Sequence, residues 1–148
     1  MNSQSTRETD PHKIELRLRT MRILWIALLL SIVMYYVYTM VVGRPENAAP
    51  NDNIFLISVA VGFVTIILSF VIKNKAVANA ATQQKVELVQ PGYIVAWALC
   101  EVSALLGMLV FFATNNRYYY TLFILGALGQ LIHFPRREHL LNASFKPQ

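Results

Sequence analysis

Charged residues and cysteine are both scarce in this sequence. Only 14% of its 148 residues are charged and 55% are hydrophobic, and the mean hydropathy is +0.44. Soluble domains typically carry about 25% charged residues, so this composition argues against an ordinary soluble domain. It indicates a protein of the lipid bilayer.

The sequence also lacks the motifs of common enzyme chemistry. It has no phosphate-binding loop, nucleophile elbow or zinc-protease motif, which disfavours hydrolytic and dinucleotide enzymes. Cys100 is the only cysteine, so no disulfide can form within the chain and we interpret it as a small packing residue. The three histidines, His12, His133 and His139, do not form a convincing metal set, and we interpret them as interfacial. We expect no enzyme activity, no metal and no cofactor.

Four long apolar runs are present, and they define the predicted fold. Each has about the length needed to cross roughly 30 Å of hydrocarbon at 1.5 Å per residue, and the fourth is the shortest. The first run is too long for a cleavable signal peptide and follows a charged leader. We therefore predict an all-α polytopic membrane protein with four transmembrane helices in a compact antiparallel bundle. The runs cover residues 21–42, 54–72, 93–113 and 118–134.

Basic residues are distributed unequally among the segments that flank these runs. Eleven lie before or at the start of the first run, between the second and third, or after the fourth, whereas only Arg44 and Arg117 lie in the other two connections. The positive-inside rule then predicts that both termini and the middle connection are cytoplasmic, in the inner membrane of a bacterium. The basic pI of 9.6 comes without a compact basic patch interleaved with aromatics, so we expect no nucleic acid partner.

Outside the apolar runs the chain has little organisation. Residues 1–20 form a leader that we expect to be partly helical, because Asp10 can cap a helix and Pro11 fits its first position. Residues 135–148 form a short basic tail. Between the second and third runs, residues 75–90 are weakly amphipathic and contain no helix breaker before Pro91. This segment either extends the second span or lies along the membrane surface, as a linker or as a docking platform for a partner.

Two further connections are predicted on the opposite side of the membrane. The connection before the second run is rich in helix breakers, and Asn51 or Asp52 can cap the helix that follows. Residues 114–117 are too few for anything but a tight hairpin between the third and fourth spans. Tyrosines gather at both of these ends, and we interpret them as a belt at the outer membrane interface. The belt consists of Tyr35, Tyr36, Tyr38, Tyr118, Tyr119 and Tyr120.

Glu101 is the only formally charged residue well inside a predicted span. A carboxylate at this depth costs roughly 2.5 to 3.5 kcal/mol, so its presence requires a reason. No Lys or Arg lies at matching depth, and desolvation therefore favours the protonated form. A neutral carboxyl group can donate a hydrogen bond to a hydroxyl or carbonyl, and it can also load and release a proton. Because the chain offers no cation, we expect the counterpart of Glu101 to come from another chain.

Small residues at helical spacing surround this acid in the third span and recur in the second and fourth. Such pairs allow helices to approach closely in lipid. We expect them to form the helix packing around Glu101, with Ala98 on the same face as the acid. The set consists of Ala98, Cys100, Ser103, Ala104 and Gly107 in the third span, Ser58 and Gly62 in the second, and Gly126 and Gly129 in the fourth.

Residues 98–107, with the sequence ALCEVSALLG, resemble the carboxylate-bearing helix of the c subunits of rotary ATP synthases, the proteolipids. In that family two helices form a hairpin with a cytoplasmic loop, and the acid lies midway along the second helix. The resemblance implies that Glu101 binds a proton or Na⁺. Here, however, two further spans flank the hairpin, and the second span has Gly62 in place of a glycine-rich repeat.

Three functions of different class follow from these features. The first is an interaction subunit of a larger membrane complex, with Glu101 as a protonatable contact and the lipid bilayer, other membrane subunits or a second copy as partners. The second is proton or Na⁺ transport through Glu101. The third is a small proton-coupled exporter, by analogy with the small multidrug-resistance exporters, which have four short spans and one membrane glutamate, although theirs lies in the first span.

Overall fold

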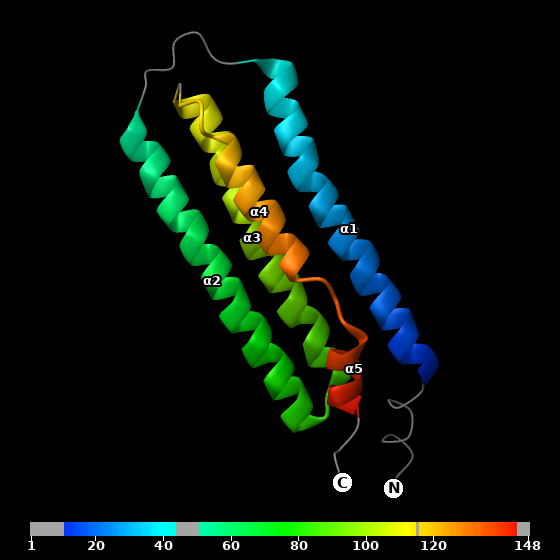
Figure 1. Cartoon of the computed structure of the whole chain (residues 1–148). Coiled ribbons are helices and arrows are strands. Elements are labelled where there is room, and N and C mark those ends of the chain that lie inside the picture. Colours follow the sequence, from blue (N-terminus) through cyan, green and yellow to red (C-terminus); the bar gives the residue numbers. More distant parts are fainter. Residues whose placement is uncertain (1–10, 44–50, 115, 145–148) are drawn as a thin grey trace, which may run out of the picture.

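The computed structural model describes residues 11–43, 51–114 and 116–144, and every regular element in these ranges is helical. The prediction of an all-α chain is confirmed for this part of the molecule. Figure 1 shows the elements in chain order. They are α1 (Pro11–Val42), α2 (Asp52–Gln83), the 3-10 turn η1 (Val86–Leu88), α3 (Val89–Ala113), α4 (Tyr120–Ile132) and α5 (Arg137–Ser144).

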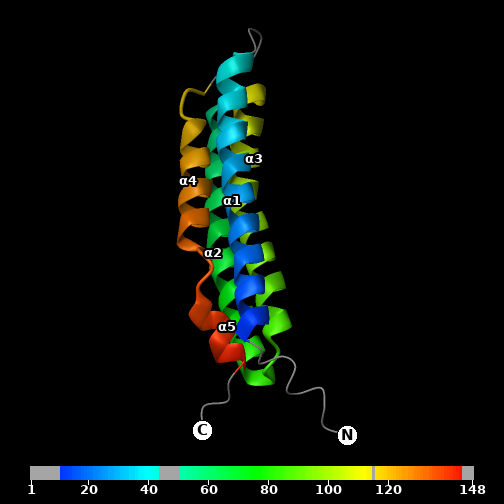
Figure 2. The same cartoon turned by 90° about the vertical axis from the view of Figure 1, so that its right-hand side faces the viewer.

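The four longer helices lie side by side, and successive helices run in opposite directions (Figure 1). α3 and α4 pack between α1 and α2, and the backbones of the described parts of these two outer helices do not lie close to each other. Figure 2 shows the same bundle after a quarter turn, with α3 on one side of α1 and α2 and α4 on the other. In cross-section the bundle is therefore a diamond, with α3 and α4 across its short diagonal.

Three helices are long and apolar enough to cross a membrane: His12–Val42, Asp52–Gln83 and Val86–Ala113. α1 and α2 have 32 residues each, which is about 48 Å at 1.5 Å per residue, so about 18 Å of each extends beyond a 30 Å hydrocarbon layer. The extra length lies at the end of the bundle that holds α5, the start of α1 and the α2–α3 connection (Figure 1). We call this the inner end.

The fourth predicted span, 118–134, is shorter in the structure. α4 has 13 residues, or about 20 Å of helix. Its first residues are lost to a turn that contains Tyr118 and Tyr119, and its last to an irregular stretch that begins at His133. Pro135 explains the inner boundary, because proline disfavours helical geometry in the residue before it and cannot donate a backbone hydrogen bond.

The segment between the second and third spans is helical for most of its length. α2 continues past the predicted end of its span to Gln83, and Gln84 ends it with a positive φ of 54°. Pro91 and Gly92 do not interrupt the chain as expected but lie in the first turn of α3. Proline is tolerated there because first-turn N–H groups have no partner inside the helix. At the other end of α2, the side chain of Asn51 accepts a hydrogen bond from the N–H of Ile54 at 3.3 Å, so Asn51 is the cap.

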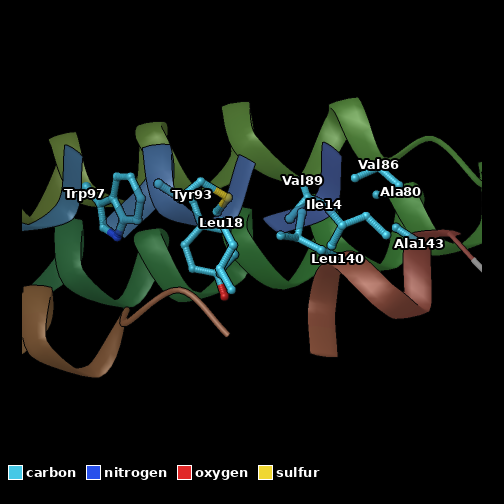
Figure 3. Packing of buried hydrophobic residues seen from close by; sticks show 10 residues of the cluster. Ile14, Leu18, Ala80, Val86, Val89, Tyr93, Trp97, Leu140 and Ala143 are labelled. Atoms are coloured by element: carbon cyan, nitrogen blue, oxygen red, sulfur yellow. The ribbon is translucent and has the colours of Figure 1, made fainter. Parts of the chain in front are cut away.

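A small hydrophobic core lies at the inner end, and it joins the beginnings of the first and third apolar runs to residues outside the runs (Figure 3). Part of the segment predicted to be a basic tail forms α5 and packs into this core, while residues 145–148 of that tail lie outside the described residues. The leader likewise contributes from Pro11 onward, and residues 1–10, including the predicted cap Asp10, lie outside the described part. The core residues are Ile14, Leu18 and Met21 of α1, Ala80 of α2, Val86 of η1, Val89, Tyr93 and Trp97 of α3, and Leu140 and Ala143 of α5.

Candidate functional site

Glu101 has a hydrogen-bond partner within the chain. It lies midway along α3, is partly buried, and its Oε1 atom is hydrogen-bonded to the hydroxyl of Ser31 in α1. The predicted need for a polar counterpart is therefore met by a hydroxyl of the same chain, and not by another chain as expected. This bond joins two helices that are distant in sequence.

The Ser31 hydroxyl has two oxygen neighbours and a single proton to donate. The Ser31 hydroxyl also lies 2.7 Å from the backbone carbonyl of Leu28. A hydroxyl has one proton and cannot donate to Leu28 and Glu101 at once. If Glu101 carries a proton, it donates to Ser31, and Ser31 donates to the carbonyl of Leu28. Both hydroxyl hydrogens then have an acceptor, and no charge remains at membrane depth.

The face of α3 that carries Glu101 is turned towards α1 and the outside of the bundle. Ala98, predicted to pack beside the acid, is exposed, and Leu105 on the following turn is 49% exposed. Spacing places these residues on one face correctly, but it does not reveal that the face points outward. The acid therefore lies at the edge of a surface formed by α1 and α3 that the described chain leaves open.

The other small residues lie on the opposite side of α3, against α2 and α4. A Cβ atom added at Gly126 would lie 2.9 Å from the carbonyl oxygen of Cys100, and one at Gly62 would lie 2.9 Å from the hydroxyl of Ser103. Such distances leave no room for a side chain, so these helices approach each other closely within one chain. All eight of these positions are buried: Ser58, Gly62, Cys100, Ser103, Ala104, Gly107, Gly126 and Gly129.

The predicted outer tyrosine belt is divided in the structure. Tyr118, Tyr120 and Tyr38 are exposed, whereas Tyr119 is buried and packs on the ring of Phe111 with ring centres 4.9 Å apart. Tyr119 is therefore a core residue of the hairpin between α3 and α4. Tyr35 and Tyr36 are partly buried and line the same core.

Two tryptophans donate hydrogen bonds to backbone carbonyls at the end of α4. Trp25 of α1 donates its indole N–H to the carbonyl of Gln130 at 2.7 Å, and Trp97 of α3 donates to the carbonyl of His133 at 3.0 Å. The final carbonyls of a helix have no partner within it, and in lipid an unpaired carbonyl is costly. The two indoles therefore permit α4 to end early.

Beside this helix end is a group of fully buried polar side chains. The hydroxyl of Ser69 in α2 lies 3.3 Å from Nε2 of His133 and 3.7 Å from the sulfur of Cys100. His133 Nδ1 lies 2.6 Å from the carbonyl of Gly129, which makes Nδ1 the donor. Gln130 is fully buried, and neither atom of its amide has a hydrogen-bond partner in the described chain. The sequence offers one clue to this group, a glutamine within an apolar run.

Closer to the inner end, the hydroxyl of Tyr93 lies 2.5 Å from Nδ1 of His139 in α5. Burial lowers the pKa of His139, and the positive charges of Lys73 and Arg136 lower it further, against an opposing effect of Glu138. His139 is therefore neutral near pH 7 and can accept the hydrogen bond of Tyr93. In the residues that the structure describes, no group of three or more metal-binding side chains occurs.

Comparison of the chain with protein families, with curated proteins and with solved structures gives no match. The class of protein is therefore defined by the fold and the site alone. It is an all-helical chain with three helices able to cross a membrane and a fourth, shorter apolar helix within the described ranges.

Proposed function

We propose that this chain is an interaction subunit of a larger membrane complex and that Glu101, in its protonated form, is part of the contact surface. The observation that carries the proposal is the Ser31–Glu101 hydrogen bond at the open edge between α1 and α3. The acid is held by one hydroxyl while the surface around it, including Ala98 and Leu105, remains uncovered. A protonated carboxyl group has a second oxygen that can accept a hydrogen bond from a partner helix.

The shape of the bundle supports this assignment. α1 packs on α3 and α4 along one side only, and most of its apolar side chains face outward. In a membrane such a surface contacts either lipid or another helix, and a polar group at its edge favours a helix that can satisfy it. Within the described residues, no second charged side chain lies beside Glu101 that could pass a proton to or from it. A contact function does not require such a proton pathway.

A photo-crosslinking amino acid at Leu105, on the Glu101 face, tests the proposal in intact membranes. Leu128 of α4 is the matched control, because it is equally exposed, at 52%, on the other side of the diamond. We expect discrete protein adducts from position 105 and only lipid adducts from position 128. Glu101→Leu is expected to remove the adducts, and Glu101→Gln to retain them, because an amide keeps the neutral hydrogen-bonding group. Lipid adducts alone at position 105 would refute the proposal.

Ion binding is a second candidate, because three oxygen atoms converge on one point. The Glu101 carboxyl, the Ser31 hydroxyl and the Leu28 carbonyl lie together, and oxygen ligands of this kind suit a small cation once the carboxyl is ionised. This function predicts that labelling of Glu101 by a hydrophobic carbodiimide falls as Na⁺ or pH rises, and that Glu101→Gln abolishes flux in reconstituted vesicles. Retained flux in that variant would exclude it. The contact function predicts no ion flux in the unaltered chain or in the Glu101→Gln variant.

A further inference from the structure

Two cations lie where the bundle leaves the apolar zone at its inner end. Lys73 directly follows the apolar run of α2, and Arg136 follows that of α4 by two residues. Nζ of Lys73 lies 5.3 Å from the ring centre of Phe70, whose ring is 4.4 Å from that of His133. Lys73 therefore borders the connection between α4 and α5 that carries Arg136.

These two cations have no counter-ion in the described part of the chain. Within those ranges the only salt bridge of a lysine or arginine joins Arg17 to Glu87 and includes neither Lys73 nor Arg136. Phe70 places Lys73 beside the connection that carries Arg136, so the two positive charges repel each other, and both also oppose protonation of His139. Glu138 acts on His139 but forms no salt bridge here. Holding two like charges together without an anion costs free energy, so this part of the structure favours a bound anion.

We propose that Lys73 and Arg136 bind the phosphate of an anionic phospholipid. A lipid is favoured over a free phosphate because the cations adjoin apolar side chains that face outward. Val71, two residues before Lys73, is 43% exposed, and Ile132, four residues before Arg136, is 59% exposed, so acyl chains can lie against them while the phosphate meets the two charges. Lipid phosphates lie immediately outside the hydrocarbon layer, which is the level at which both apolar runs end. The proposal does not depend on the function of Glu101.

Thermal unfolding of the full chain in mild detergent, followed by fluorescence of Trp25 and Trp97, tests the site. Dihexanoyl phosphatidylglycerol is titrated into the protein, with dihexanoyl phosphatidylcholine and inorganic phosphate as comparisons. We expect only the anionic lipid to raise the Tm. The double variant Lys73→Gln with Arg136→Gln is expected to weaken its apparent affinity about 30-fold, at about 5-fold for each charge.

The matched control is the double variant Lys75→Gln with Arg137→Gln, which removes the same number of charges from exposed positions nearby. We expect this control to retain the affinity within about 2-fold of the unaltered chain, as a specific site requires. Equal losses in the two variants would overturn the proposal in favour of general charge attraction. An equal rise in Tm with phosphatidylcholine would overturn the proposal, because any lipid would then stabilise the protein. An equal rise in Tm with inorganic phosphate would show that the ligand is a free phosphate and not a lipid.

Folding of the test variant is itself informative. Because the two cations repel each other, their removal is expected to leave the lipid-free Tm unchanged or higher. If the double variant does not fold, the single variants Lys73→Gln and Arg136→Gln are compared, each with an expected loss of about 5-fold. No loss in either single variant would overturn the proposal.

Discussion

Substitution of Gly92 by alanine tests the closest approach of a glycine to a neighbouring helix in the described residues. A Cβ atom at Gly92, in the first turn of α3, would overlap the Cβ of Ala76 in α2. Helix propensity alone predicts that alanine stabilises this position by up to about 1 kcal/mol. Overpacking of a rigid contact costs about 1 to 3 kcal/mol, and the methyl group of Ala76 cannot rotate away. If overpacking costs about 3 kcal/mol and helix propensity returns about 1 kcal/mol, Gly92→Ala is expected to lower the free energy of unfolding by about 2 kcal/mol.

The reciprocal change provides the control. Ala76→Gly alone is expected to cost about 1 kcal/mol through helix propensity. Combined with Gly92→Ala it removes the overlapping atom, and the Cα of Ala76, 3.7 Å away, is then an ordinary contact. The double variant should therefore match the stability of the unaltered chain, which corresponds to a coupling of about 3 kcal/mol. Unfolding in mixed micelles with increasing dodecyl sulfate, followed by tryptophan fluorescence, measures all four proteins. A Gly92→Ala variant at least as stable as the unaltered chain would refute the reasoning.

Two further predictions concern the inner half of the molecule. Trp97→Phe removes the N–H that donates to the carbonyl of His133. Because that carbonyl stays buried without a donor, the free energy of unfolding in the same assay should fall by about 1 to 3 kcal/mol. An unchanged free energy of unfolding would contradict the capping role of Trp97. His139 has a lowered pKa in the folded state, so the unfolded state binds more protons as the pH falls. The contribution of neutral His139 to stability is therefore complete above about pH 6.5 and is lost as the pH falls below that value. The Tm of the unaltered chain should fall between pH 7.5 and 5.5 by more than that of His139→Asn, and parallel curves would assign the pH effect to other groups.

Helices whose sequence signal is long and continuous could be located, and the ends of α1 and α3 and the start of α2 were predicted to within two residues. The apolar runs located α1, α2 and α3 because about twenty consecutive apolar residues are characteristic of a helix that crosses a membrane. Residue type narrowed the cap of α2 to Asn51 or Asp52, and the hydrogen bond to the N–H of Ile54 identifies Asn51. Pro91 was misleading, because a proline has opposite meanings in the first turn and in the interior of a helix, and the sequence does not state where the helix begins.

Features that depend on contacts between helices were not accessible in the same way. α5 has only eight residues, and a helix of this length is not stable without packing against other elements. Because the core of the inner end supplies that packing, the sequence of α5 alone predicted an unstructured tail. The partnership of Ser31 with Glu101 depends on the rotation of α1 and α3 about their axes, for which neither helix carries a signal. The exposure of Ala98 has the same origin, since helical spacing gives the members of a face and not its direction.

The separation of α1 from α2 has a consequence for the order in which the molecule is assembled during synthesis. α1 and α2 are synthesised before α3 and α4, and their backbones do not lie close to each other in the described part of the folded chain, so α1 gains its main packing partners only when α3 and α4 arrive. Until then the hydroxyl of Ser31 needs no other chain, because the carbonyl of Leu28 lies within its reach. The Ser31 hydroxyl can therefore already donate to the carbonyl of Leu28 when Glu101 enters the membrane. Its oxygen is then available to accept a hydrogen bond from the carboxyl group of Glu101.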